Sequence, residues 1–374
     1  MPNQPPYYRV IIENAAGDYV EMHDFTSLKY SYSLNNAGYA ELTLPLKSAK
    51  VNSLTVAPLQ SWLRVYRWSD RDDPSSERLV WYGLLFDPSY STDSLTGDIT
   101  LRYKDLAGIL AHRFVPRTYS VTSLTDASQI LWNIINASQL ETGGDLDIVQ
   151  GAAPVSKDRQ PEKDLQNRSI LDVLIAFSEY EDGIDWEITP TPRNASIGNF
   201  NTYYTSASQP YHKGYEVGTP LTYFVDDTNA MAFNNIASVT IDEVGSEYAN
   251  DILALGATIE DVQLFSTAEN APQKTIYGLF ENVVSETNVS EQSTLDDKAS
   301  EELSASETVP FNIVLTMLPL QKPVFGTFDV GDIFTFRFKF YTLRDFERPY
   351  RLYRFTMNVD DMGVETTTME LNNI

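Results

Sequence analysis

The chain of 374 residues contains no cysteine, only three histidines and no long apolar run. Without cysteine there are no disulfides, no thiol nucleophile and no thiolate zinc site. His23, His112 and His212 are isolated from one another, so no local pair has the spacing of metal ligands. No segment approaches the roughly 18 apolar residues of a membrane span, and the first residues lack a secretory signal. We therefore expect a soluble protein that is made in a cytoplasm.

Basic residues are also scarce relative to acids. The chain has 27 Lys and Arg against 52 Asp and Glu, which gives a formal net charge of −25. This excess repels phosphate backbones and disfavours tight nucleic-acid binding. The acids are interspersed with 22 Tyr and 18 Phe, so the composition is that of a folded protein with an acidic surface, not of a disordered acidic tail.

Motifs for catalysis and cofactor binding are missing as well. There is no nucleophile elbow, P-loop or dinucleotide-binding glycine motif. Residues 179–187 lack the residue order of a calcium loop. A pair of carboxylates could serve a glycosidase, but no local pattern selects two of them. We therefore expect no catalytic residue, no metal and no cofactor.

The N-terminal third has the pattern of β-strands. Apolar residues alternate with polar ones over 28–34 and again over 40–44, and "NNAG" between them supplies a turn, which predicts a hairpin. Further strands are expected over 62–68, 79–86 and 99–103.

Helical spacing appears between about 105 and 190. One helix is expected around 127–135, with Thr125 or Asp126 as its cap, and another between Ser169 and Gly183. A strand follows over 184–188, with Asp185 and Glu187 on its exposed side. Residues 190–220 are expected to form a long connection or a loose arm.

The C-terminal part repeats the layout of the first third. Strands are expected over 333–340 and 351–359, with a polar loop over 341–350 between them and a closing strand after a turn. We therefore predict a mainly β (α+β) fold with two tube-like β-barrel domains and an inserted α/β region. The expected bounds are 1–113 for the first barrel, 114–229 for the insertion and 230–374 for the second barrel.

The second barrel is expected to carry one helix near 293–305. Ser293 is the expected N-cap, and Leu295, Ala299 and Leu303 form a narrow apolar stripe. Acidic residues occupy its other faces, where early acids suit the positive end of a helix. This pattern favours a solvated helix lying over a sheet, and not a metal or acid/base site.

Several stretches, in order along the chain, resemble the baseplate hub proteins of long-tailed (siphovirus-type) bacteriophages, which are tail-tip minor tail proteins. The stretches that carry the resemblance are "YSLNNAGYAELTLPL", "VWYGLLFDPSYS", "ITLRYKDLAGILAHRFVP", "SILDVLIAFSEYEDGIDWEITP", "FDVGDIFTFRFKF" and "VDDMGVETTTMELN". The residues of these motifs that the resemblance marks as structural are Trp81, Gly83, Asp105, Leu106, Gly331 and Asp332. The family supplies no catalytic residues to transfer.

The resemblance implies a structural role in the virion, at the tail tip. The expected partners are two further copies in a homotrimer, a distal tail or tail-tube ring, the tape-measure protein, and receptor-binding, tail-fibre or spike proteins. DNA is expected to pass through the channel of the trimeric ring without sequence-specific binding. Two alternatives stay open: a tail-associated hydrolase of the cell wall, and a carbohydrate-binding adhesin module.

Overall fold

The structure is a computed structural model that describes residues 7–373, apart from 15, 49, 52–55, 70–72, 93–96, 118, 122, 160–164, 166–167, 180–182, 192–196, 206–211, 226–233, 260–261, 288, 308, 310 and 320. The chain divides into two compact units. Unit 1 comprises residues 1–239 and 314–371, and unit 2 comprises residues 240–313 and 372–374. Unit 1 therefore combines segments from both ends of the sequence.

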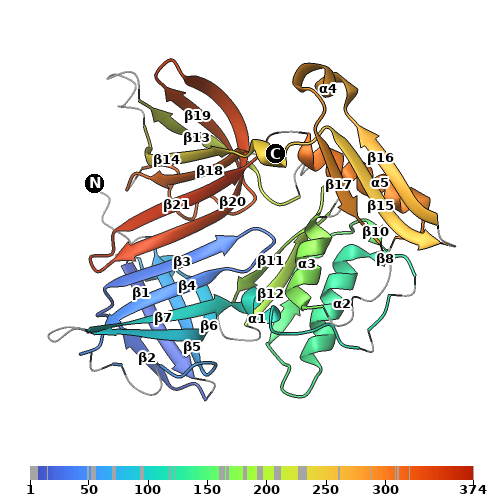
Figure 1. Cartoon of the computed structure of the whole chain (residues 1–374). Helices are drawn as coiled ribbons and strands as arrows, with labels where there is room; N and C mark the ends of the chain where they lie inside the picture. Colours follow the sequence, from blue (N-terminus) through green and yellow to red (C-terminus); the bar gives the residue numbers. More distant parts are fainter. Residues whose placement is uncertain are drawn as a thin grey trace. The chain divides into compact units, whose positions relative to one another are not determined.

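Seven strands of unit 1 form the N-terminal part of a large sheet (Figure 1). They are β1 (Tyr7–Asn14), β2 (Tyr19–Met22), β3 (Ser27–Ser33), β4 (Tyr39–Pro45), β5 (Ser61–Trp68), β6 (Glu77–Thr92) and β7 (Gly97–Asp105). Their order is β3-β4-β7-β6-β5-β1-β2. The predicted hairpin is confirmed: Leu28 lies opposite Leu42, and both side chains are buried. Along β4 and β7 every second residue is buried, which places their apolar residues on one face of the sheet.

Six further strands continue the same sheet. They are β13 (Glu216–Phe224), β14 (Ile236–Glu243), β18 (Phe311–Met317), β19 (Ile333–Phe340), β20 (Arg344–Asp360) and β21 (Glu365–Asn372). The long strand β20 makes the connection, because its residues 344–351 pair with β19 and its residues 354–360 pair with β3 (Figure 1). The strands predicted over 333–340 and 351–359 are confirmed, and Phe334 and Phe336 of β19 are fully buried.

The prediction of two closed β-barrels needs correction. Among the described strands no pairing closes a ring, and the two sets of strands join in one sheet of 13 strands. Near the C-terminal end of β13, two asparagine side chains take the place of a neighbouring strand. Asn235 accepts from the backbone N–H of Thr222, and Asn234 accepts from that of Phe224. These amides satisfy backbone donors that a neighbouring strand would otherwise satisfy. The fold is mainly β, with a few helices, and the predicted domain bounds stay predictions.

The helical part of unit 1 contains both predicted helices. Its elements are α1 (Leu106–Leu110), β8 (Thr125–Asp126), α2 (Ala127–Gln139), β9 (Ile148–Gln150), β10 (Asp158–Arg159), α3 (Ile170–Glu179), β11 (Asp185–Pro190) and β12 (Gly198–Tyr203). Asp126 caps α2 by accepting from Gln129 N at 3.3 Å, and Ser169 Oγ accepts from Asp172 N at 3.1 Å at the start of α3. The apolar stripes of these helices pack into a shared core with Trp186 of β11.

Two segments expected to be loops contain strands. Within 190–220, β12 pairs with β11, and β13 starts at Glu216 and pairs with β19. Residues 344–350 belong to β20 and lie opposite β19. Asn, Gly, Pro and acidic residues lower strand propensity, but a neighbouring strand that supplies the ladder outweighs this weak preference.

Unit 2 is a three-stranded sheet with two helices. Its elements are β15 (Asp251–Ile259), β16 (Val262–Glu269), α4 (Ala271–Tyr277), β17 (Glu281–Ser285) and α5 (Gln292–Ser306), and the strand order is β16-β15-β17. As predicted, α5 lies over the sheet, with Leu295 and Ala299 fully buried. The N-cap is Glu291 and not Ser293, because the carbonyl of Glu291 already accepts from Leu295 N. Within the described part of the chain, no helix is long and apolar enough to cross a membrane.

Candidate functional site

The residues predicted to be structural all lie in unit 1: Trp81, Gly83, Asp105, Leu106, Gly331 and Asp332. The first four lie where β6 pairs with the end of β7, which continues directly into α1. The last two lie in the turn that precedes β19. The sequence motifs therefore mark two separate junctions between elements, and not one shared site.

Asp105 organises the first junction. Its carboxylate caps α1 by accepting from Gly108 N at 2.7 Å, and it also accepts from Gly38 N at 2.6 Å, in the turn between β3 and β4. Asp105 is half-buried, and loss of hydration around its carboxyl group raises its pKa to about 7, against the opposing effect of the amide donors. Asp105 therefore holds a turn, a strand end and a helix start together.

Gly83 allows the close approach of β6 and β7 at this junction. A Cβ atom at Gly83 would lie 2.2 Å from the carbonyl oxygen of Lys104 and 2.4 Å from the ring of Trp81. Trp81 is buried and meets the Tyr103 ring edge-on, with centroids 6.5 Å apart. Leu106 packs into the core of the helical part. The space around Gly83 therefore requires a residue without a side chain.

The second junction pairs two glycines. Gly331 and Gly214 both have positive φ, +93° and +103°, and a Cβ on Gly214 would lie 2.1 Å from the Gly331 carbonyl oxygen. Next to them, Asp332 accepts from the backbone N–H groups of Tyr215 at 2.9 Å and Asp329 at 2.8 Å. Burial raises the pKa of Asp332, while these two donors oppose the rise. The segment before β13 is thereby fixed to the turn before β19.

A buried charge network beside this junction was not foreseen from the sequence. Asp185, predicted to be exposed, is only 2% exposed. It accepts from Asn35 Nδ2 at 2.7 Å, from Lys213 N at 2.8 Å and from the guanidinium of Arg351. Arg351 also donates to the carbonyls of Gly331 and Lys213, at 3.2 and 2.8 Å. Asp185 thus connects β11 to β20 and to the β3–β4 turn.

Lys213 extends the network. Its ammonium group bonds to Glu187 at 2.5 Å and to Asp329 at 3.0 Å, and its side chain is 7% exposed. Burial disfavours the charged form of this group, but the two carboxylates outweigh burial and raise its pKa. Glu187 was predicted on the exposed side of its strand, and its partner Lys213 lies 26 residues away, so no local pattern identifies the pair.

A third buried cluster connects β1 and β5 to β21. Arg67 donates from Nε and Nη2 to the two carboxylate oxygens of Glu365, and the Nη2 distance is 3.0 Å. The hydroxyl of Tyr8 donates to the same carboxylate and lies 3.0 Å from the hydroxyl of Tyr30. Burial, and then the charge of Glu365, raise the pKa of Tyr8. The partners lie 298 and 357 residues apart in sequence, so this contact depends wholly on the tertiary fold.

These carboxylates are engaged in holding elements together. Each accepts backbone N–H groups or pairs with a guanidinium or ammonium group, an arrangement that fixes geometry. Among the residues that the structure describes, no group of three or more His, Asp and Glu side chains has the arrangement of a metal site. What this chemistry supports is a stable scaffold.

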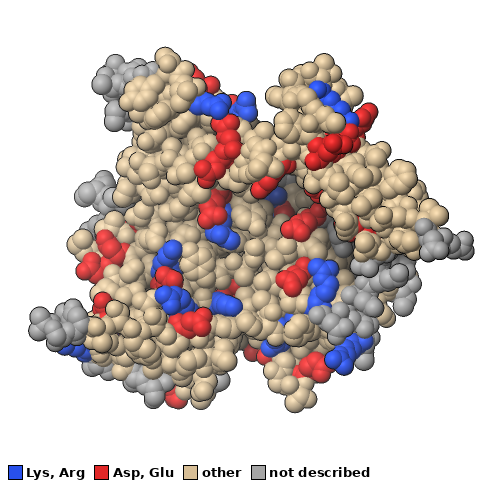
Figure 2. Space-filling model, viewed as in Figure 1, with Lys and Arg blue, Asp and Glu red and all other residues tan. Residues whose placement is uncertain are grey.

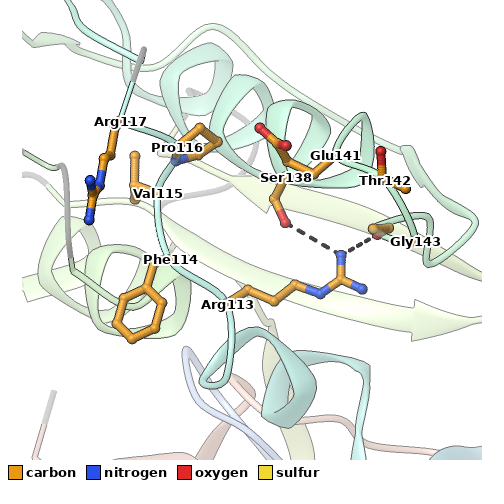
Figure 3. Close-up of a pocket in the computed structure, with 10 residues that line it drawn as sticks. Arg113, Phe114, Val115, Pro116, Arg117, Ser138, Glu141, Thr142 and Gly143 are labelled. Atoms are coloured by element: carbon orange, nitrogen blue, oxygen red, sulfur yellow. Dashed lines mark hydrogen bonds between the residues drawn. The ribbon is translucent and has the colours of Figure 1, made fainter.

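A shallow hollow of about 580 Å³ lies at the end of α2. Figure 3 shows Arg113 reaching across it, where its guanidinium donates to Ser138 Oγ at 3.4 Å and to the carbonyl of Gly144. Burial lowers the pKa of Arg113, and Asp145 opposes this change. Phe114 on the rim is 65% exposed. Because the guanidinium already closes the loop after α2, we assign Arg113 a structural role.

Comparison with solved structures finds the same fold in phage tail proteins. The tail protein from Neisseria meningitidis MC58 matches with a TM-score of 0.62 at 13% identity, over 98% of this chain and 96% of that chain. The 43 kDa tail protein of prophage MuSo2 from Shewanella oneidensis matches with a TM-score of 0.65 at 10% identity, over 98% of both chains. A chain of the Francisella PdpA–VgrG complex matches with a TM-score of 0.54 at 10% identity, over 99% of this chain and 58% of that one.

Sequence comparison adds nothing to this result, since no family model and no curated protein matches the chain. The two tail proteins are described as such, and neither description names an enzymatic activity. Over its whole length, this chain has the fold of a phage tail protein.

Proposed function

We propose that the protein is a structural subunit of a bacteriophage tail, and specifically the hub of the baseplate at the tail tip. The observation that carries the proposal is the likeness to two tail proteins over 98% of this chain and at least 96% of theirs. The buried charge networks, which tie distant strands together, are consistent with a load-carrying scaffold.

In this role, three copies form a ring that continues the tail tube. Each copy contributes the strands around β3–β7 and those around β18–β21, which are two parts of one sheet, as two segments of the ring wall, so three copies present six. A closed ring also covers the sheet edges that a single copy leaves unpaired. The proposed neighbours are a distal tail or tube ring, the tape-measure protein, and receptor-binding, fibre or spike proteins. The protein is then part of the virion and has no catalytic function.

The ring surrounds the passage for DNA, and part of the acidic excess lines it. Carboxylates on the wall offer passing phosphates no ion pairs, which lets DNA slide. Figure 2 shows acidic side chains spread over one face of the molecule, with Lys and Arg between them. The buried Asp185 cannot contribute to such a wall. The exposed acids of α5 remain candidates.

Electron microscopy of assembled tails tests the proposal. We expect density for three copies in one ring at the tail tip. A ring of two or six copies would contradict the trimer, and absence of the protein from purified tails would contradict the virion role. Hydrolysis of purified cell wall, lost on substitution of a single carboxylate, would instead support the tail-associated enzyme.

A further inference from the structure

The sheet of unit 2 has one covered face and one open face. Ile252, Ala254 and Gly256 of β15 are buried on the side of α5, where a Cβ on Gly256 would lie 3.0 Å from the Leu295 side chain. Neighbouring residues along a strand point to opposite faces, so the alternate positions of the three strands form the other face. Among the described residues of unit 2, the α-helices are α4 and α5 (Figure 1). No further helix of this described part covers the face opposite α5.

This open face has an apolar centre, formed by Leu253, Leu255, Phe265 and Val283. The pairing of the strands places Leu253 beside Val283, and Leu255 beside Phe265, on the same side of the sheet. Phe265 is 62% exposed and Val283 is 55% exposed, while the two leucines are half-buried. A β-sheet normally covers such a surface with another layer.

Three carboxylates form a row at one end of the open face. Asp251 lies opposite Glu269 on β16 and beside Glu281 on β17, so all three side chains share the face. Lys274 of α4 bonds to the carboxylates of Asp251 and Glu269, at 2.5 Å for Glu269. In Figure 2, acidic side chains gather beside α4, and most of the surface over β15 and β16 is neither acidic nor basic. Apolar area and acidic end are thus adjacent.

The loop after α4 adds to the exposed apolar surface. The buried side chain of Asn250 fixes this loop, because it donates to the Gly278 carbonyl at 2.8 Å and accepts from Phe280 N at 3.0 Å. Despite this anchoring, Tyr277 at the end of α4 and Leu279 and Phe280 in the loop are each 45 to 62% exposed. A rigidly held loop that presents apolar side chains to water is typical of a contact surface.

The charge of unit 2 specifies what such a surface can bind. Residues 240–313 contain 15 Asp and Glu but only two Lys, so this segment carries about half of the net charge of the chain in a fifth of its length. Both lysines, Lys274 and Lys298, are engaged in ion pairs with carboxylates. Complementary charge steers association, and like charge opposes it. A cationic partner is therefore attracted, and a second unit 2 is repelled.

We propose that the open face of unit 2 is a docking surface for a cationic, apolar segment of another protein. Valine-like or aromatic side chains of that segment cover Leu253, Leu255, Phe265 and Val283, and its Lys or Arg residues meet the row of Asp251, Glu269 and Glu281. Among the strands that the structure describes, the two outer strands β16 and β17 each pair with β15 alone, so a segment in extended conformation can also align with the sheet. This inference goes beyond the hub role and holds for the isolated protein as well as for an assembled ring.

Peptide binding to the purified full-length chain tests the proposal. The probes are a short fluorescent peptide of alternating lysine and valine and a peptide of equal charge with serine in place of valine, compared by anisotropy. We expect the valine peptide to bind more tightly. The double variant F265T/V283T should weaken its binding about tenfold, as expected from lost apolar contact, and leave the serine peptide unchanged. A matched control is L343T, since Leu343 is 73% exposed and lies in unit 1.

A second pair of variants tests the carboxylate row. The change E269Q/E281Q should weaken binding of the valine peptide several-fold at low salt. The control E291Q/D297N removes the same charge from the start of α5, on the covered side, and should have little effect. Circular dichroism checks that each variant is folded. Equal binding of both peptides, or loss with E291Q/D297N as large as with E269Q/E281Q, would overturn the proposal.

Other occupants of the surface give distinct results. Self-association of the wild type in sedimentation, abolished by F265T/V283T, would assign the face to a second copy and overturn the cationic partner. Binding to anionic lipid vesicles that depends on the same two residues would also overturn it, in favour of a membrane. Neither result bears on the number of copies at the tail tip, so failure of this inference and failure of the hub proposal are distinguishable.

Discussion

Unit 1 and unit 2 differ in which side chains they bury and in how much apolar surface they leave exposed. Unit 1 buries large aromatic side chains along with complete ion pairs, such as Arg351 with Asp185. Unit 2 has a small core, in which Ala254, Val289, Leu295 and Ala299 are buried together, and keeps apolar side chains such as Phe265 exposed. The difference indicates that unit 1 is stabilised by contacts within itself, while unit 2 leaves apolar surface exposed that another protein can contact.

The largest effect is expected from the buried pair in unit 1. The change Arg351→Ala leaves Asp185 buried without its cation and should lower the free energy of unfolding by about 3 to 5 kcal/mol. The matched control is Arg337→Ala on the adjacent strand, whose pair with Glu347 is exposed on both sides. That change should cost less than about 1 kcal/mol. Urea unfolding of both variants measures the difference, and equal losses would show that burial does not strengthen this pair.

Asp105 should make the stability of unit 1 depend on pH. Its pKa in the folded protein is about 7, above the ordinary value near 3.8, so the folded protein holds a proton that the unfolded chain releases between these values. Stability from this group is therefore present below about pH 4 and lost as pH rises to about 7, by roughly 4 kcal/mol. The change Asp105→Asn should remove this part of the slope. Urea midpoints between pH 4 and 8 measure it, and an unchanged slope in the variant would contradict the assignment.

Leu295 tests whether unit 2 unfolds by itself. Leu295→Ala creates a cavity under α5 and should destabilise unit 2 by about 2 to 3 kcal/mol. Because the core of unit 2 is small, we expect faster hydrogen exchange across β15, β16 and α5, with α2 and α3 unaffected. Hydrogen-exchange mass spectrometry measures this. Leu303→Ala, at a half-buried position on the same helix, is the control and should have a smaller effect. Faster exchange in α2 as well would mean that the units unfold together.

The smallest effect concerns salt. The crowded negative charge of residues 240–313 should make unit 2 less stable at low ionic strength, and salt should restore about 1 kcal/mol or less by screening. Unit 1 should gain less, because a net charge of similar size is spread over about four times as many residues. Hydrogen exchange at low and moderate sodium chloride compares the two units in one sample. An equal change of hydrogen exchange with salt in both units would show that charge does not distinguish the stability of unit 2 from that of unit 1.

Local patterns predicted local structure well. The cap at Asp126 and the stripe of α2 could be found because helix signals lie within a few residues of one another. The same holds for the β3–β4 hairpin, where the turn and both strands are contiguous. Ser293 failed as a cap since Glu291, two residues earlier, already starts the helix and makes no side-chain bond that a pattern would reveal.

What the sequence did not reveal depends on distant partners. Asp185 follows the alternation of an exposed residue, and the partners that make its burial favourable, Asn35, Lys213 and Arg351, lie 28 to 166 positions away in the sequence. Residues 344–350 contain a proline and charged side chains that suggest a loop, yet β19 supplies a ladder for them. The open face of unit 2 was also hidden, because the pairing of β15 with β17 is not encoded in either strand alone. The prediction of closed barrels was wrong for the same reason. The strand β20 joins the two sets of strands by pairing with β3, which is distant in sequence.

The pairing of β20 with β3 sets an order of events during synthesis. The outer edge of β3, residues 27–33, can be paired only after residues 354–360 have been synthesised, more than 320 positions downstream. At about 5 to 20 residues per second, a ribosome needs on the order of 20 to 60 s to make the intervening chain. During that interval the nascent N-terminal sheet exposes an unpaired edge, which is prone to aggregate. Chaperones that hold nascent chains should therefore matter more for the yield of this protein than for one whose edge strands pair early.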